Sequence, residues 1–385
     1  MHFLFSTLLF LISPVLGVLF AFLHVLNARE VKTQEVFFLI VLFSTLLGIL
    51  NACKIPESDL EVYKLWYEDV AHYSFLDYLF YLGKEPLFFL YNYLMYYLTF
   101  GFFELYLILN TAICYTIMGY ALLKMHKAFK LPNEYFLIGL IFLFFFPNLF
   151  TLSAHINRQF LASSLLVLFI VDFVFYSKKR IALLLSTIFI HTSSAIYVLL
   201  FFLRKLNSNR WTIFLVSLIF IIVSYFLNQI SRLFSIQSID NSNAINYGLS
   251  RIQNREGAIE FETLGILSYA LCLFVVLVFY WLKQRWRSNN RAILLYISLF
   301  ILTFITVNYF DTELASRFSF FMYFLFPISL YFFLKLIELK KFWFDRKATV
   351  LFFLLIFGYW FTYKIIYGVW EYENIERVIF TGFWK

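Results

Sequence analysis

Charged residues are scarce in this sequence. Asp, Glu, Lys and Arg make up only 14% of its 385 residues, whereas 62% are hydrophobic. No soluble globular domain has such a composition. The apolar residues form repeated runs near the ~20 residues that a helix needs to cross a bilayer, and a helix satisfies its own backbone polar groups. The sequence therefore predicts an all-α, polytopic integral membrane helical bundle of about 10–12 transmembrane helices, forming one domain over residues 1–385.

Motifs for metal binding and for several common kinds of catalysis are also absent. The 3 cysteines, Cys53, Cys114 and Cys272, are scattered, and we interpret them as small buried hydrophobes. No two histidines have metal-ligand spacing, and no Gly-rich phosphate loop or nucleophile elbow occurs. We therefore expect neither a metal site nor a cofactor. No internal repeat of fixed period and no low-complexity linker divides the chain.

Basic residues collect in short clusters between the apolar runs and give the chain a net charge of +8. Such clusters hold loops on the cytoplasmic side of a membrane, so they indicate topology and not a nucleic-acid partner. Residues 178–180, two lysines and an arginine, are the clearest example. By this rule a first, retained membrane helix from Phe3 to Val25 begins outside, and residues 52–85 and 230–260 are predicted to be two larger extracytoplasmic loops.

The first of these loops, residues 52–85, is both acidic and aromatic. Stacked rings and carboxylates suit the faces and hydroxyls of sugars, so the loop is a candidate for binding a glycan. The alternative is that its amphipathic rings simply lie at the membrane interface. The acidic and aromatic residues include Glu57, Asp59, Glu61, Glu68, Asp69, Asp77, Glu85, Tyr63, Trp66, Tyr67, Tyr73, Tyr78 and Tyr81.

Three apolar segments do not fit straight crossings. Residues 86–100 form a short run, so we expect a re-entrant or interfacial helix there. The run 135–150 is broken late by Pro147. The run 181–203 has basic residues at both ends and a polar seam at His191. Either this run is broken near His191 into two half-helices, or one of its basic clusters lies outside.

A polar cluster interrupts the apolar sequence at residues 153–159, which include His155, Arg158 and Gln159. A charged side chain at membrane depth costs at least ~2.5 kcal/mol and normally faces a water-filled or protein-lined cavity. The charge rule predicts that the cluster lies at the outer face. His155 and Arg158 are three residues apart and would share a face on a helical turn.

Other arginines are predicted on the same outer side. Arg317 begins one apolar run, and Arg251 lies in the second loop. Guanidinium groups are rigid bidentate donors that suit phosphate, so several of them at one rim would fit a pyrophosphate. For proton transfer, His155 or His191 could act as a general base. The carboxylates that compete for this role are Asp59, Glu85, Asp311 and Glu313.

These residues also have structural interpretations. Arg158 could snorkel to the interface from a helix end. His191 could be an intramembrane histidine that is hydrogen-bonded to a neighbouring carbonyl. Asp311 and Glu313 could be solvated loop residues or an N-cap pair, with a salt bridge to Arg317. Spacing alone does not decide between these interpretations and the functional ones.

Several short motifs resemble those of EpsG-like, Wzy-type polysaccharide polymerases. Asp59 to Tyr63 resembles the family pattern Asp-x-x-x-Tyr, and Glu85-Pro86 resembles its Glu-Pro pattern. Arg158 to Ala162 is similar to Arg-Gln-x-x-Ala, and Phe189 to Ala195 is similar to Phe-His-x-Ser-Ala. Ser316 to Phe318, with Tyr323, resembles the late arginine motif of the family. The resemblance spans roughly residues 59–323.

Such proteins join oligosaccharide repeat units carried on undecaprenyl pyrophosphate at the outer face of the bacterial inner membrane. The resemblance implies the same glycosyl transfer here, with the pyrophosphate lipid as leaving group. It implies catalytic roles for Arg158 and for a base, which is His191 or Asp59. The partners to expect are the lipid-linked oligosaccharide, the lipid bilayer, a chain-length regulator and a flippase. The candidate residues for binding pyrophosphate and glycan are Arg158, Arg317, Arg251, Tyr63, Glu85 and His155.

Two other classes of function compete with the polymerase. A lipid-linked glycan flippase or transporter would show repeat symmetry and polar residues near the midplane, whereas the charges here cluster at the outer ends of helices. A membrane O-acyltransferase that modifies the same glycan would also carry histidine and arginine in a helical bundle. The polymerase is the first hypothesis, and the other two remain as alternatives.

Overall fold

The computed structural model of the chain is helical throughout the part that it describes, which confirms the predicted all-α class. Within that part the only β feature is a single bridge between Lys54 and Tyr372. The described residues are 2–28, 32–81, 85–129, 132–192, 194–195, 206, 209–235, 264–285, 289–307, 313–337 and 345–380.

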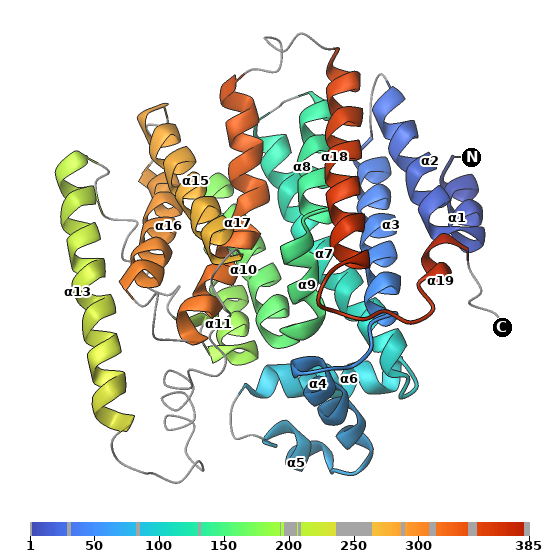
Figure 1. Cartoon of the computed structure of the whole chain (residues 1–385), viewed down its shortest axis with the longest axis horizontal. Helices are drawn as coiled ribbons and strands as arrows, with labels where there is room; N and C mark the ends of the chain where they lie inside the picture. Colours follow the sequence, from blue (N-terminus) through green and yellow to red (C-terminus); the bar gives the residue numbers. More distant parts are fainter. Residues whose placement is uncertain are drawn as a thin grey trace. The chain divides into compact units, whose positions relative to one another are not determined.

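Figure 1 shows the helices in chain order. They are α1 (His2–Ile12), α2 (Pro14–Asn27), α3 (Thr33–Ala52), α4 (Asp59–Glu68), η1 (Asp69–Ala71), α5 (Phe75–Leu79), α6 (Pro86–Leu98), α7 (Phe103–Phe129), α8 (Asn133–Phe144), α9 (Pro147–His155), α10 (Asn157–Tyr176), α11 (Ile181–Ile190), α13 (Arg210–Ser235), α15 (Leu264–Arg285), α16 (Asn289–Val307), α17 (Glu313–Ile337), α18 (Arg346–Ile366) and α19 (Glu376–Ile379). The predicted loop 52–85 is therefore largely helical. Most of the predicted loop 230–260 lies outside the described residues.

Within the described residues, four helices are long and apolar enough to cross a bilayer, namely α3, α7, α10 and α18. The pair α8 and α9 is a fifth candidate. Shorter apolar helices of 10–17 residues, among them α1, α2 and α11, account for other apolar runs. The chain is thus a multi-pass membrane protein. The predicted total of about 10–12 crossings stays a prediction, because the spans were identified only among the described residues.

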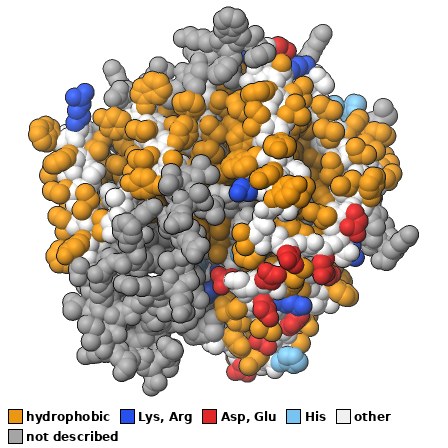
Figure 2. Space-filling model, viewed as in Figure 1, with side chains coloured by type: hydrophobic (Ala, Val, Ile, Leu, Met, Phe, Trp, Pro, Cys, Tyr) orange, Lys and Arg blue, Asp and Glu red, His pale blue; other side chains and the backbone are white. Residues whose placement is uncertain are grey.

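The outer surface of these helices is strongly apolar. On α18, for example, Leu355 is 72% and Tyr359 is 74% exposed. Figure 2 shows hydrophobic side chains over the upright helices, whereas Asp and Glu gather at one end. A bilayer explains the combination, because lipid tails cover apolar side chains and water solvates the charged end.

The first apolar run forms a helical hairpin, so the prediction of one retained membrane helix was wrong. The chain breaks at Pro14, which has no N–H to continue the preceding helix. The rings of His2 and His24 stack with their centroids 4.2 Å apart, so α1 folds back along α2. Gly17 permits this close approach, because a Cβ there would lie 2.5 Å from the backbone of Phe10.

The other irregular segments follow the sequence predictions. α8 and α9 are bent by 50° at the break before Pro147. α11 ends at Ile190, and His191 has extended backbone with φ −150°, which confirms the predicted break. The second half of that run, residues 196–203, lies outside the described residues. α6 has 13 residues and a length of about 20 Å, which suits a re-entrant or interfacial helix and not a crossing.

Small residues allow α3 and α7 to pack closely. A Cβ on Gly48 would lie 2.4 Å from the carbonyl oxygen of Ile108, and a Cβ on Gly119 would lie 2.6 Å from the side chain of Ile40. Glycines at such contacts let the backbones of two membrane helices approach each other. The two contacts also show that α3 and α7 run antiparallel, since Ile40 precedes Gly48 whereas Gly119 follows Ile108.

The cap, formed by α4, η1, α5 and α6, is fixed to one end of α7 (Figure 1). Tyr106 of α7 donates a hydrogen bond to Asn92 of α6, and Tyr91 of α6 donates one to Asn110 of α7, each at 2.9 Å. These bonds satisfy buried polar groups that would otherwise be costly. A buried cluster joins the cap to α7 and α9; its members are Leu60, Tyr67, Met95, Phe103, Tyr106, Leu107 and Ala154.

Backbone contacts divide the chain into two compact units. Unit 1 is made of Met1–Asp172, Lys179–Ser193 and Leu334–Lys385. It contains helices α1 to α9, which include the cap, most of α10, and α11, α18 and α19. Unit 2 is made of Phe173–Lys178 and Ser194–Phe333. In unit 2, α16 packs on α13, with the rings of Phe220 and Phe300 5.1 Å apart. The single domain over residues 1–385 stays a prediction.

We expect Gly48→Ala to destabilise the fold. The added methyl group would meet backbone, which cannot turn aside as a side chain can, so α3 and α7 would have to separate. Overpacking of this kind costs about 1–3 kcal/mol. The matched control is Gly358→Ala on α18, where no atom lies within 4 Å of the Cβ position. Thermal unfolding in detergent measures both, and equal Tm values would contradict the packing.

Candidate functional site

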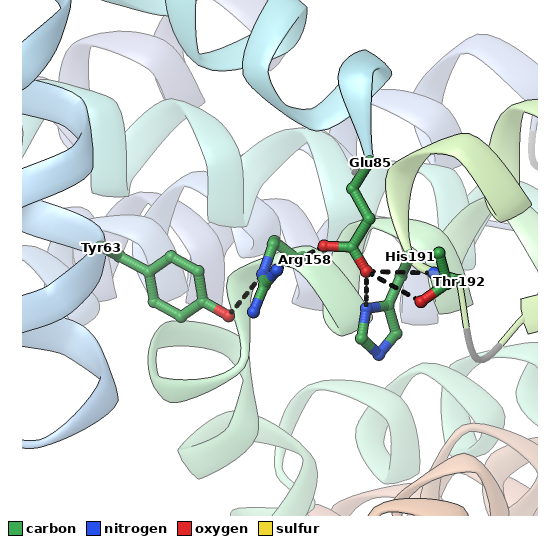
Figure 3. Close-up of polar contacts among 5 residues, drawn as sticks. All are labelled: Tyr63, Glu85, Arg158, His191 and Thr192. Carbon is green, nitrogen blue, oxygen red and sulfur yellow. Dashed lines mark hydrogen bonds and ion pairs between the residues drawn. The ribbon is translucent and has the colours of Figure 1, made fainter. Parts of the chain in front are cut away.

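Glu85, the residue before α6, is the centre of a buried polar cluster in unit 1. Its side chain is almost fully buried, at 2% exposure. The carboxylate accepts hydrogen bonds from Nη1 of Arg158, from Nδ1 of His191 at 3.0 Å, and from the backbone N–H and hydroxyl of Thr192 at 3.1 and 3.2 Å. Figure 3 shows these side chains converging from three segments of the chain. We call Glu85, Arg158, His191 and Thr192 the Glu85 cluster.

The backbone of Glu85 is in an uncommon conformation. Its φ of 57° and ψ of 47° are left-handed, a region that few residues other than glycine adopt. Pro86 follows directly and begins α6, as proline often does at a first helical position. Proline also disfavours the right-handed helical conformation in the residue that precedes it. Such strain costs on the order of 1–3 kcal/mol, so the contacts of the Glu85 carboxylate must hold it in place.

His191 and Thr192 reach Glu85 because α11 ends just before them. In a continuous helix, the N–H of residue 192 would bond to the carbonyl four residues back. The extended backbone of His191 turns the chain away, so that the N–H of Thr192 donates to Glu85 instead. The break predicted from the polar seam therefore supplies three donors to the site, Nδ1 of His191 and the N–H and hydroxyl of Thr192.

Arg158 lies in the first turn of α10, inside an aromatic box. The centre of its guanidinium is 4.8 Å from the ring centroid of Trp66, 5.9 Å from that of Tyr63 and 6.0 Å from that of Phe88. Its Nε donates to the hydroxyl of Tyr63 at 3.4 Å. Cation–π contacts and the ion pair with Glu85 together hold the planar group in one orientation.

Glu85 is ionised at neutral pH. Burial raises the pKa of this carboxyl, but the hydrogen bond from His191 and the charge of Arg158 outweigh burial and lower the pKa to about 2. An ionised carboxylate can only accept hydrogen bonds. Nδ1 of His191 therefore carries the proton, and in the neutral ring Nε2 is the nitrogen that can take up another.

The Glu85 cluster combines an oriented imidazole with a fixed cation. A carboxylate that holds Nδ1–H of a histidine sets the tautomer and orientation that a general base requires. A guanidinium is suited to bind phosphate oxygens. Among the described residues, no group of three or more His, Cys, Asp or Glu side chains could hold a metal ion.

Asp59, the competing base, lies in the first turn of α4, one turn before Tyr63. Within the described chain, no hydrogen bond or ion pair joins its carboxylate to the Glu85 cluster. Its catalytic role stays a prediction. The remaining predicted site residues lie outside what the structure describes: Arg251 and Asp311 altogether, and the side chains of Glu313 and Arg317.

His155 has different neighbours from Arg158. α9 ends at His155 and α10 begins at Asn157, so the single helical turn that would place His155 and Arg158 on one face is interrupted. The imidazole of His155 instead stacks on Trp370, with centroids 3.4 Å apart. Its expected role in binding the substrate stays a prediction.

The sequence did not place Trp66 beside Arg158 or Thr192 beside Glu85. Trp66 is three residues from Tyr63, so both lie on one face of α4, and that spacing could have linked them. The contact with Arg158 could not be foreseen, because it depends on how the cap packs. For Thr192 the signal was present in its position next to His191 at a helix break.

The pattern of the EpsG family matches residues 5–374, nearly the whole chain. The chain belongs to the EpsG family. Membership implies a role in exopolysaccharide biosynthesis for this multi-pass membrane protein. The matched region contains every residue of the Glu85 cluster. No curated protein and no solved structure gives a match.

We expect Glu85→Gln to destabilise this EpsG family member in a pH-dependent way. The amide leaves Arg158 as a buried charge without its partner, and breaking such a pair costs about 3–5 kcal/mol. Because the pKa of Glu85 is lowered in the folded state, the contribution of its carboxylate is complete above the ordinary pKa of 4.5 and is lost as the pH falls towards 2.

Thermal unfolding from neutral pH down to about pH 3 measures this effect. The Tm of Glu85→Gln should lie furthest below that of the wild type near neutral pH and approach it in acid. Glu68→Gln is the control, because Glu68 is an exposed carboxylate whose ion pair within the described residues is with Lys64 at 3.9 Å. A deficit of Glu85→Gln that stays constant over the whole pH range would contradict the low pKa.

Proposed function

We propose that this protein polymerises oligosaccharide repeat units linked to undecaprenyl pyrophosphate at the outer face of the bacterial inner membrane. In this reaction a bond forms between a hydroxyl oxygen of the acceptor unit and the anomeric carbon of the donor glycan. The bond between that carbon and the pyrophosphate oxygen breaks. The observation that carries the proposal is the Glu85 cluster, because one carboxylate joins a guanidinium to an imidazole.

On the leaving-group side, negative charge develops on the pyrophosphate as its bond to the anomeric carbon breaks. A preorganised cation at that position stabilises the transition state more than the ground state. Arg158 is the candidate, since its box of Tyr63, Trp66 and Phe88 fixes the guanidinium before substrate arrives. Arg251 and Arg317 are proposed as further pyrophosphate ligands on the basis of sequence.

On the acceptor side, the attacking hydroxyl must lose its proton. His191 is the proposed base, because Glu85 holds its Nδ1–H, so that in the neutral ring Nε2 is the nitrogen that carries no proton. Glu85 is a poor base itself, since its pKa is lowered to about 2. It is therefore proposed as a positioning residue for both Arg158 and His191.

The cap offers a surface on which a glycan could lie. A groove of about 580 Å³ is lined by Tyr73, Leu76, Asp77, Phe80 and Tyr81. Aromatic rings suit the apolar faces of sugars, and a carboxylate accepts hydrogen bonds from their hydroxyls. This supports the sugar-binding interpretation of the acidic, aromatic segment 52–85.

The proposed outer location is supported by the two ends of α10. Arg158 is in its first turn, whereas Asp172 near its other end pairs with Lys124 and, at 2.8 Å, with Arg180. The rise from Arg158 to Asp172 is about 21 Å. Basic clusters favour the cytoplasmic side, so the opposite end with the Glu85 cluster would face outward. Partners at that face would be the lipid-linked substrate, a flippase that delivers it and a chain-length regulator.

We expect Arg158→Ala to abolish the ladder of polymer lengths in cells and to reduce turnover of purified protein by roughly 10²–10³-fold. The charge on the leaving pyrophosphate would lose its stabilising partner. Arg158→Lys keeps the charge but not the planar fork, so it should recover only part of the activity. Arg210→Ala, at an exposed arginine that begins α13, is the control and should polymerise normally.

The same cells distinguish a polymerase from a transporter. Loss of polymerisation leaves single lipid-linked repeat units at the outer face of the membrane. Repeat units that stayed on the cytoplasmic face would identify a transport defect and overturn the proposal. A full ladder in Arg158→Ala cells would remove the role assigned to this residue.

We expect His191→Gln to lower kcat by about 10²–10⁴-fold, the range for loss of a general base. Gln keeps a polar group near Glu85 but cannot accept the proton. Binding of the lipid-linked unit should change much less, so KM stays near its wild-type value. Assays in nanodiscs with defined lipid-linked units measure both constants. A rise in KM with unchanged kcat would assign His191 to binding and not to proton transfer.

A further inference from the structure

A second buried polar group lies under the C-terminal strap, which we define as residues 370–374. The strap follows α18 and crosses the end of α3 (Figure 1). Backbone hydrogen bonds of 3.1 and 2.7 Å join residues 53–55 to residues 371–373. A single antiparallel bridge pairs Lys54 with Tyr372. The strap therefore covers the side chain of Lys54.

Lys54 is a buried lysine that has no anionic partner among the described residues. It is 4% exposed, and its Nζ has no hydrogen-bond partner among the described residues. The ammonium lies 4.5 Å from the ring centroid of Phe150 and 5.9 Å from that of Tyr372. Burial lowers the pKa of Lys54 to about 7, which reflects the cost of a charge in this environment.

His155 lies in the same place and is also unsatisfied. It is 6% exposed, and neither ring nitrogen has a partner in the described part of the chain. It is close enough to Lys54 for the two to interact electrostatically. Trp370 of the strap covers one face of its ring at 3.4 Å. Buried polar groups in folded proteins are nearly always bonded, so two adjacent exceptions need an explanation.

We propose that Lys54 and His155 form a second binding site, which takes a compact oxyanion, a phosphate or a carboxylate, beneath the C-terminal strap. An ammonium brings three N–H donors and a neutral imidazole brings one. An oxyanion supplies both the acceptors and the negative charge that the site lacks. The rings of Phe150, Trp370 and Tyr372 form apolar walls, which strengthen such a pair by excluding water.

This site is independent of the polymerase proposal. None of its residues belongs to the Glu85 cluster, and its occupancy can be measured without a glycan. The ligand can be free in solution or carried by a lipid headgroup, because both present the same oxyanion. Failure of one proposal therefore leaves the other intact.

The test uses the full-length protein in a non-ionic detergent and phosphate-free buffer, so that neither the solvent nor a lipid headgroup supplies an oxyanion. Lys54→Met removes the charge and keeps most of the volume, so its Tm should exceed that of the wild type. Added inorganic phosphate or glucuronate should raise the Tm of the wild type and leave that of Lys54→Met unchanged. Lys64→Met, at a half-exposed lysine of α4, is the matched control and should respond like the wild type.

Tryptophan fluorescence supplies a local readout. Phosphate or glucuronate should change the emission saturably in the wild type, and the change should disappear in Trp370→Phe. Lys54→Gln, a second variant in case Lys54→Met does not fold, should bind at least about tenfold more weakly. Nanodiscs with anionic lipid that abolish the response to free phosphate would identify the headgroup as the source.

Three results would overturn the proposal. The first is a lower Tm for Lys54→Met in phosphate-free buffer, which would mean that the aromatic rings alone satisfy the ammonium. The second is the absence of a saturable response to either anion, in which case the site holds only water. The third is a response that persists in Trp370→Phe, which would place the bound anion elsewhere, for example at Arg158.

Discussion

The buried ion pair between Glu85 and Arg158 is the interaction on which the arrangement of the site depends. It links the cap to α10, and through His191 and Thr192 it links both to the end of α11. Each charge makes the burial of the other tolerable, because an unpaired ion at this depth would cost several kcal/mol. One carboxylate and the aromatic box around its partner thus hold four segments together, namely α4, the start of α6, the start of α10 and the end of α11.

Stability alone does not account for this pair. Well-packed apolar residues can join buried segments equally well or better, since they carry no desolvation penalty. Here the charges are kept, the backbone of Glu85 is strained, and a histidine with a defined tautomer is added. Strain and charge held together by surrounding contacts are typical of functional sites. These features support the Glu85 cluster as the candidate site.

Much of the fold could be predicted from the sequence because the bilayer imposes simple physical limits. Apolar run lengths predict the helical membrane class, and Pro147 and the polar seam at His191 predict two breaks. The break between α1 and α2 had a signal in Pro14, of the same kind as Pro147, that the prediction of one helix overlooked. The close packing of the hairpin could not be predicted, because Gly17 matters only once a neighbouring helix lies against it. The predicted number of crossings, about 10–12, stays a prediction, because parts of several apolar runs lie outside the described residues.

The residues of the site could be predicted one by one but not as a group. Arg158 and His191 stand out because charge and imidazole are rare in apolar sequence. Both contact Glu85, which is 73 residues from Arg158 and 106 residues from His191 in the sequence. No local sequence pattern predicts contacts over such separations. For the same reason, sequence could not rank Asp59 against Glu85. As candidate bases, the two carboxylates differ in their burial and in the charged groups beside them, and only the packed structure shows both.

Position 85 must satisfy two requirements that favour different amino acids. The left-handed backbone before Pro86 favours glycine or asparagine, whereas the cluster requires an ionised carboxylate. A residue chosen for the backbone would make the turn more stable and leave Arg158 and His191 without their common acceptor. Because loss of the ion pair costs about 3–5 kcal/mol and the strain only about 1–3 kcal/mol, selection for heat resistance would keep glutamate at this position and would relieve its strain only through the residues around it.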